Sequence, residues 1–145
     1  MGEFVDLTNA RTDKYKGVLE KIKSDKVCPF CRENFEQYSK EPVILETDTW
    51  YAAKNSYSYQ ESALALIVVL KRHLESLSEV RDIEWLEGLY FIRALIEEFK
   101  VEGGGLVVRF GDTRYTGATV KHLHFHLIVP EIKNRKAVPV YFPIG

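Results

Sequence analysis

Three of the four histidines of this chain lie close together, each separated from the next by one apolar residue. His122, His124 and His126 alternate with Leu123 and Phe125, a pattern that favours a β-strand. Alternate side chains of a strand point to the same face, so the three imidazoles would stand in one row, whereas a helix would spread them apart. A neutral imidazole serves as a nucleophile or as a metal ligand. The strand alone predicts a site of one kind or the other without separating them.

The chain has two cysteines, Cys28 and Cys31, separated by Pro-Phe. This spacing suits a metal knuckle or a redox pair better than the disulfide framework of a secreted protein. A buried pair of small apolar thiols is the third interpretation. If the knuckle lies near the histidine strand, Cys28 and Cys31 would join His73 and His122 in a tetrahedral Cys₂His₂ zinc site. The alternative for His73 is a bond to the backbone at the end of a strand.

A loop rich in glycine and hydroxyl side chains precedes the histidine segment, over residues 111–119. Glycines such as Gly117 let backbone amides approach phosphate oxygens, and Thr119 adds a hydroxyl donor. Arg109 and Arg114 are candidates for charge-assisted bonds to the same group, with ordinary surface arginine as the equal alternative. The loop therefore predicts a phosphate-binding site.

The length and composition of the chain are those of one globular domain. It has 145 residues, of which 46% are hydrophobic and 28% charged, and its formal net charge is −1. A nearly neutral chain has no overall basic field, so no nucleic-acid partner is expected. We expect a single domain over residues 1–145, with an arm and helix over 1–24 and a C-terminal extension over 131–145.

No segment predicts membrane insertion or export. The longest apolar run, residues 63–70, is too short to cross a bilayer. The N-terminus lacks the basic and apolar regions of a signal peptide, and Asp6 replaces the Ser or Thr of the myristoylation pattern. The expected compartment is therefore the cytoplasm.

The hydrophobic pattern predicts the elements that must position these residues. The expected strands are 43–46, 49–53, 63–70, 106–110 and the histidine segment. The expected helices are a short one capped near Thr12 and running to about 23, and a long amphipathic one over about 82–101, stopped by three glycines. The expected irregular segments are a loose arm over 1–9, loops over 54–62 and 111–117, an exposed polar stretch over 132–137 and a last extended piece over 138–143. Antiparallel strands with one main helix predict an α+β fold with a sheet of about five strands.

Three motifs carry a resemblance to a known family. Residues 122–128 (HLHFHLI) resemble the histidine triad signature, in which histidines alternate with apolar residues. Residues 67–73 (IVVLKRH) resemble the family's strand ending in Pro-Lys-x-His, and residues 28–31 (CPFC) resemble the cysteine pair of its zinc-carrying members. Their order and spacing match from about residue 27 to 130. The chain therefore resembles the histidine triad (HIT) family of nucleotidyl hydrolases and transferases.

The resemblance implies a catalytic role for two histidines. His124 would attack the α-phosphate of a nucleoside phosphoramidate or dinucleoside polyphosphate and form a nucleotidyl-histidine intermediate. His126 would donate to oxygens of the same phosphate or to the leaving group. The main-chain carbonyl near His122 would accept the second ring proton of His124. An imidazole suits this chemistry because it is nucleophilic near neutral pH and brings no negative charge to an anionic phosphorus.

The resemblance also implies ligands and partners. Cys28, Cys31, His73 and His122 match the four zinc positions of the zinc-carrying members. Thr119 falls where the family often has a Ser or Thr on the phosphate, and Asn55 near its ribose-contacting residue, with turn chemistry as the alternative. The apolar side of the 43–53 hairpin is a candidate wall of the base pocket. A homodimer would pair through the long helix and a sheet edge.

Several positions depart from the family pattern. Ala118 replaces a common Gln next to the phosphate, and Ala65 replaces a further histidine. The usual Asn-x-Gly reads Arg109-Phe-Gly111, and the loop after it is longer by about two residues. The nucleophile is retained while the leaving-group machinery differs. These departures favour a rival function, a nucleotide-binding or regulatory module with little turnover. A zinc-stabilised interaction module is a third alternative.

Overall fold

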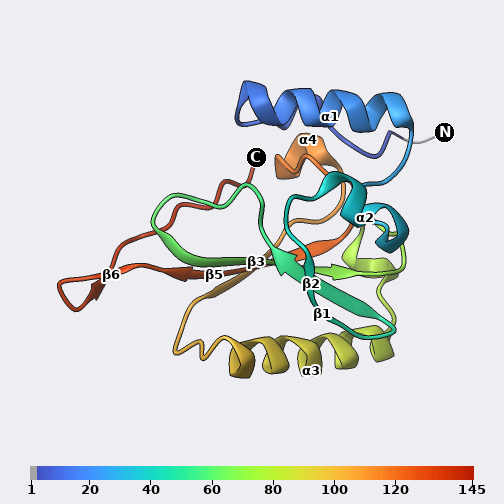
Figure 1. Ribbon diagram of the computed structural model, residues 1–145. Helices are drawn as coiled ribbons and strands as arrows, with labels where there is room; N and C mark the ends of the chain where they lie inside the picture. The colour runs from blue at the N-terminus through green and yellow to red at the C-terminus, as the bar shows by residue number, and fades with distance from the viewer. Residues whose placement is uncertain (1–2) are drawn as a thin grey trace.

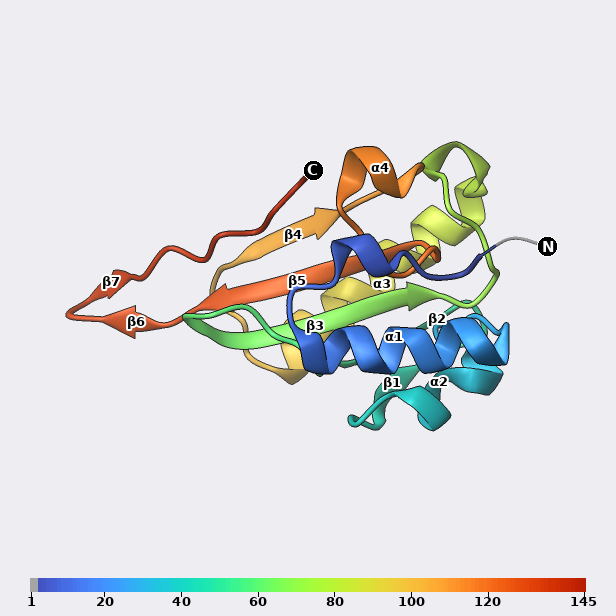
Figure 2. The same cartoon turned by 90° about the horizontal axis from the view of Figure 1, so that it is seen from above.

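The computed structural model describes residues 3–145; Met1 and Gly2, which belong to the predicted arm and to the myristoylation pattern, lie outside them. Its centre is a five-stranded antiparallel sheet in the order β1-β2-β3-β5-β4 (Figure 2). The strands are β1 (Val43–Glu46), β2 (Trp50–Lys54), β3 (Ser62–Leu70), β4 (Gly105–Val108) and β5 (His124–Pro130). The predicted α+β fold with about five strands is confirmed, and the triad strand β5 lies inside the sheet between β3 and β4.

Helices cover both faces of this sheet. α3 lies below it in Figure 1, and α1, α2 and α4 lie above it. The helices are α1 (Asp13–Asp25), α2 (Arg32–Tyr38), α3 (Asp82–Glu98) and α4 (Thr113–Thr116), with short 3₁₀ turns at Leu7–Asn9 and Leu77–Glu79. The Thr12 hydroxyl accepts a hydrogen bond from the Tyr15 amide and caps α1 as expected. α3 ends before the expected position because Lys100 has a left-handed φ of 51°, which no helix continues.

The side chains of β5 alternate between the hydrophobic core on one face of the sheet and the candidate site on the other. Phe125 and Leu127 point toward α3 and join a cluster with Trp50, whereas the intervening histidines face the opposite side, toward α1 and α2. Trp50 is held tightly, because its indole N–H donates to Glu84 O at 2.9 Å. A Cβ at Gly88 would lie 2.9 Å from the Trp50 ring, so only glycine lets α3 approach this strand.

The N-terminal arm is not loose, which corrects the expectation for residues 3–9. Val5 is 1% exposed and forms an isolated antiparallel bridge with Val120. The Lys121 amide donates to Phe4 O at 2.8 Å, and the Asp6 amide donates to the carbonyl of the residue before Val120 at the same distance. An isolated bridge to a residue more than a hundred positions away leaves no periodic signal in the nine residues of the arm. The arm therefore joins the segment that leads into β5.

Other segments also differ from the expectation. Helix α2 begins directly after Cys31, and α4 lies within the stretch expected to be a loop. The segment after β5 forms a small exposed hairpin, β6 (Ile132–Lys133) with β7 (Lys136–Ala137), and residues 138–145 then return without forming a strand until the Gly145 amide donates to Thr116 O (Figure 2). Among residues 3–145, no helix combines the length and the apolar character needed to cross a membrane.

Candidate functional site

The four predicted metal ligands come together at one point. One ligand atom from each of Cys28, Cys31, His73 and His122 lies within 4.8 Å of the others. The Nδ1 atom of His122 lies 3.3 Å from Cys28 Sγ and 3.2 Å from His73 Nδ1, and Cys31 Sγ lies 3.6 Å from His73 Nδ1. A tetrahedral zinc site with bonds of about 2.0–2.3 Å has ligand-to-ligand edges of about 3.3–3.8 Å. The donor set and its spacing therefore fit a tetrahedral metal ion.

The orientation of His122 suits metal binding. Its Nε2–H donates to Leu70 O at 2.6 Å, so the lone pair is on Nδ1, which faces the cluster. Burial lowers the pKa of His122 to about 4 and keeps the ring neutral. Burial also raises the pKa of the Cys28 thiol to about 12, so a bound cation would have to replace its proton. His122 precedes β5, which corrects the expectation that it stands in the strand with the other two histidines.

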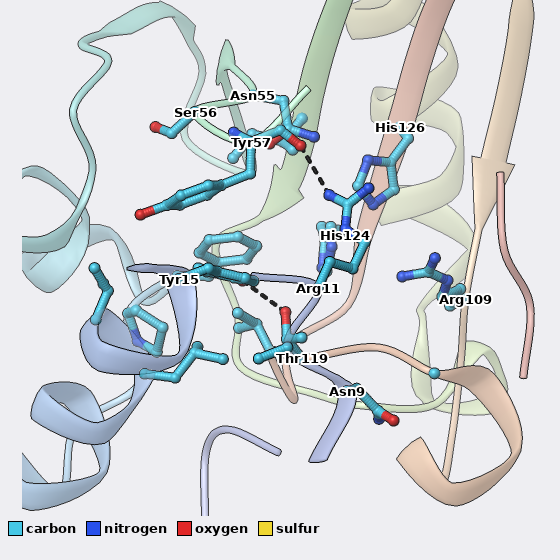
Figure 3. Close-up of a pocket in the computed structure, with 18 of the residues that line it drawn as sticks. Asn9, Arg11, Tyr15, Asn55, Ser56, Tyr57, Arg109, Thr119, His124 and His126 are labelled. Atoms are coloured by element: carbon cyan, nitrogen blue, oxygen red, sulfur yellow. Dashed lines mark hydrogen bonds between the residues drawn. The ribbon is translucent and has the colours of Figure 1, made fainter. Parts of the chain in front are cut away.

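His124 is the first residue of β5 and lines a cavity of about 340 Å³ on the α1 side of the sheet (Figure 3). Its Nδ1–H donates to the main-chain carbonyl of His122 at 2.6 Å, as the resemblance implies. This bond places the proton on Nδ1 and leaves the Nε2 lone pair without a proton. Burial, aided by the nearby charge of Arg109, lowers the pKa of His124 to about 4. The ring is therefore a neutral base at pH 7.

His126 lines the same cavity, with its ring centroid 5.0 Å from that of His124. The side chain is buried, and its Nδ1 has no hydrogen-bond partner among the described residues. Burial, the neighbouring His124 imidazole and the positive charges of Arg109 and Arg11 lower the pKa of His126 to about 2. A buried polar atom without a partner is costly and indicates a group that a ligand would satisfy.

The predicted phosphate-binding residues reach this cavity, with one exception. Gly117 caps α4 with a left-handed φ of 70° and lines the cavity together with Thr119. The Thr119 hydroxyl is hydrogen-bonded to the Tyr15 hydroxyl at 2.6 Å. Arg109 also lines the cavity. Arg114 does not, because its side chain is 81% exposed and pairs with the carboxylate two residues before it.

The structure places Asn55 in a turn and also at the cavity, so its position is compatible with both turn chemistry and ligand contact. Its Oδ1 accepts a hydrogen bond from the Tyr57 amide at 3.0 Å, which is turn chemistry, and the residue also lines the cavity. The hairpin β1–β2 does not form the apolar wall that was expected of it. Phe35 of α2 packs over Tyr51 and Ala53 and covers that face of β2. The apolar lining comes instead from α1, the cysteine knuckle and α2.

Sequence reasoning missed the residues that the N-terminus contributes. Arg11 and Tyr15 line the cavity (Figure 3), and the Arg11 guanidinium lies 4.2 Å from the centroid of the Tyr59 ring. No local pattern marks these residues, since they reach the site only because the arm pairs with the segment before β5. The cavity thus collects side chains from both ends of the chain.

Comparison with known proteins identifies the family. The model of the family described as "Scavenger mRNA decapping enzyme C-term binding" matches residues 27–138, and solved histidine triad proteins share the fold. The chain belongs to the histidine triad family. No similar sequence is found among curated proteins.

Three solved histidine triad structures illustrate the likeness. A histidine triad protein from Clostridium difficile is 23% identical, with a TM-score of 0.57, over 75% of this chain and 96% of that chain. A histidine triad nucleotide-binding protein from Candida albicans is 19% identical, with a TM-score of 0.61, over 82% and 85%. A Zn-bound histidine triad family protein from Mycobacterium smegmatis is 20% identical, with a TM-score of 0.54, over 80% and 83%. At these identities the likeness establishes the histidine triad fold of the chain.

Proposed function

We propose that this histidine triad protein is a nucleotidyl hydrolase or transferase that acts through a covalent adduct on His124. The observation that carries the proposal is the 2.6 Å bond from His124 Nδ1–H to His122 O, which leaves Nε2 as a neutral nucleophile at the cavity. Nε2 forms a bond to the α-phosphorus, and the bond from phosphorus to the leaving group breaks, with its electron pair going to the leaving atom. Water or another acceptor then attacks the adduct and releases the nucleotide.

The remaining residues of the cavity have supporting roles in this proposal. His126 binds a phosphate oxygen or the leaving group, which would satisfy its unpartnered Nδ1. Gly117 and Thr119 hold the phosphate, and Asn55 contacts the ribose. A cavity of about 340 Å³ suits a nucleoside monophosphate unit. Substrates are nucleoside phosphoramidates or dinucleoside polyphosphates, and the similarity to a protein named as nucleotide-binding is consistent with this class.

The metal cluster has a structural role in this proposal. Four protein ligands would complete the shell of a zinc ion, leaving no open position for a substrate. The cluster joins the cysteine knuckle to the segment before β5. It also supports the nucleophile, because the ring of Phe30, which lies between the cysteines, meets the His124 ring edge-on at 4.8 Å. Zinc would thus fix the wall against which His124 rests.

We infer a homodimer from the outer face of α3. Phe91 and Leu95 face the core, yet the helix also exposes Leu89 at 58% and Tyr90 at 59%. Exposed apolar residues gathered along one helix face are typical of a protein interface. The edge strand β4 lies beside this layer and offers unpaired backbone groups. Sedimentation at micromolar concentration tests the inference, and a monomer under those conditions would contradict it.

Trapping the adduct tests the enzymatic proposal. The protein is mixed with a radiolabelled adenosine phosphoramidate and, separately, with a labelled diadenosine polyphosphate, and is then quenched and separated from free nucleotide. We expect label on the wild type and none on His124→Ala, with unchanged metal content in both. Labelling of the variant at the wild-type level would reject His124 as the nucleophile.

The rival function is a nucleotide-binding module with little turnover. It is favoured by Ala118, which is buried and brings no side-chain donor to the phosphate loop. Calorimetry with AMP beside a turnover assay separates the two functions. Binding of AMP without turnover of either substrate class supports the module and contradicts the enzyme.

A further inference from the structure

Two arginines that lie far apart in the sequence line the cavity that contains His124 and His126. Arg11 precedes α1, and Arg109 follows β4. The Arg11 guanidinium donates to Tyr57 O at 2.8 Å and lies 4.2 Å from the Tyr59 ring centroid. The Arg109 guanidinium donates to Pro143 O at 3.0 Å and stacks over an aromatic ring in the same manner. Each side chain is thus held in place by a carbonyl and an aromatic ring.

Neither guanidinium is neutralised by the protein. Within residues 3–145, no carboxylate lies within ion-pairing distance of Arg11 or Arg109. The chain carries 21 acidic side chains, yet in the part that the structure describes none of them lines the cavity. The carbonyls of Tyr57 and Pro143 hold the two guanidiniums without cancelling their charge. Two unpaired cations facing one cavity indicate an anionic occupant.

Both charges act at the position of His126. Figure 3 shows the Arg11 guanidinium at the carbonyl of Tyr57 and Arg109 on the other side of the cavity, and His126 lines the same cavity. Each arginine lowers the pKa of His126, and the Nδ1 atom of this buried ring has no partner in the described chain. His124 supplies the attacking nitrogen next to it. The region around His126 is therefore where negative charge would be stabilised beside the reacting phosphate.

We propose that Arg11 and Arg109 form a clamp that selects substrates with an anionic leaving group. The inference rests on the proposed function and narrows it to nucleoside polyphosphates and dinucleoside polyphosphates, in which the leaving group ends in phosphate. It excludes phosphoramidates of amines as preferred substrates.

The chemistry of the leaving group supports this choice. When the bond from the α-phosphorus to a bridging oxygen breaks, the electron pair stays on that oxygen and the departing phosphate gains negative charge. Two guanidiniums stabilise this charge in the transition state. An amine must instead take up a proton as it leaves. The low pKa of His126 keeps its ring neutral at pH 7, so no imidazolium is there to supply that proton. The resulting ammonium group would also be repelled by both arginines.

The clamp is tested with two substrates that share the adenylyl group. We compare kcat/KM for diadenosine triphosphate and for an adenosine phosphoramidate of a primary amine, using wild type, Arg11→Gln and Arg109→Gln. We expect the wild type to prefer the anionic leaving group by about 100-fold. Each Gln variant should lower kcat/KM for diadenosine triphosphate by about 10- to 100-fold and change that of the phosphoramidate by less than about threefold.

Matched variants separate charge from structure. Arg11→Lys and Arg109→Lys retain the charge and should recover part of the preference, whereas Arg114→Gln removes an exposed arginine outside the cavity and should change neither substrate. Equal losses on both substrates, or a wild-type preference for the amine, would overturn the clamp while leaving the nucleotidyl-transfer function intact. A wild type that turns over neither substrate and forms no His124 adduct would overturn the proposed function itself.

Discussion

His122 and His124 are two residues apart, yet they belong to sites of different character. His122 donates from Nε2 to Leu70 O and turns Nδ1 toward two cysteines and His73. His124 donates from Nδ1 to His122 O and turns Nε2 toward the cavity. In both cases a backbone carbonyl fixes the tautomer, and the carbonyl that is within reach decides which nitrogen is left to act.

The two sites also differ in what a ligand would do there. At the metal cluster the four side chains close around one point, which suits a permanent structural ion. At the cavity two neutral histidines, two arginines and the turn at Gly117 surround open space, which suits a ligand that binds and is released. One backbone segment connects them, because the carbonyl of His122, a proposed metal ligand, orients the ring of His124, the proposed nucleophile. The comparison teaches that two histidines only two residues apart acquire different roles from their hydrogen-bond partners.

Substituting asparagine for His124 and, separately, for His122 is the strongest test of the different roles proposed for these two residues. His124→Asn should lower kcat at least about 1,000-fold, because no other group at the cavity replaces the nucleophile. His122→Asn retains its main-chain carbonyl, so it should behave like His73→Asn, losing metal with a smaller loss of kcat. Steady-state kinetics with metal analysis measures both. A His122→Asn variant that retains metal and loses all turnover would contradict the division of roles.

Replacing Cys28, a proposed metal ligand, is expected to have the next largest effect. Cys28→Ser should lose the bound metal and lower the free energy of unfolding by about 3 kcal/mol, or roughly 10 °C in Tm for a chain of this size. Treating the wild type with a chelator should give the same Tm, and the chelator should not change the variant further. Calorimetry with and without the chelator checks this. A stable variant of unchanged Tm would show that the cluster does not hold a structural ion.

The pH dependence of the free energy of unfolding tests whether the fold holds His124 and His126 neutral. The folded pKa of His124 is about 4 and that of His126 about 2, below the ordinary value of about 6.5 in an unfolded chain. The unfolded chain therefore binds more protons below about pH 6.5, and the free energy of unfolding falls as the pH drops toward 4. Each histidine contributes at most about 1.4 kcal/mol per pH unit.

Denaturation in urea at several pH values, on wild type and His126→Gln, measures this contribution. The variant should show a shallower loss of stability between about pH 6 and pH 4.5, because one buried neutral histidine is gone. Parallel curves for the two proteins would show that His126 is not held neutral by the fold. Metal content must be equal in both samples, since the ligands of the cluster also take up protons.

The smallest expected effect concerns the hydroxyl of Thr119. Thr119→Val removes one donor to the phosphate and the bond to Tyr15, and should lower kcat/KM by about 5- to 10-fold. Thr119→Ser retains the hydroxyl and should remain within about twofold of wild type. Tyr15→Phe tests whether the loss comes from the hydroxyl pair. Equal activity of the Val and Ser variants would place the phosphate elsewhere.

The elements with strong periodicity were predictable, and the site residues outside them were not. The triad strand, the apolar run that became β3 and the amphipathic helix α3 follow from spacing alone, because burial on one face imposes a local repeat. Helix α2 is seven residues long and α4 four, which is too short for a clear period. The place of Arg11 at the site was not predictable from local sequence, since it depends on the bridge between Val5 and Val120.

The sequence by itself determined the order of the histidines, the cysteine spacing and the alternation that sends Phe125 and His126 to opposite faces of the sheet. These are properties of a few neighbouring residues, so no distant contact is needed to produce them. Only the tertiary structure decided which nitrogen of His122 is free, because the carbonyl that it contacts belongs to Leu70 at the end of β3. It also decided that Arg11 and Arg109, 98 positions apart in the sequence, face one cavity. Hydrogen bonds and charges act between whichever groups folding brings together, and that choice is made by packing across the sheet.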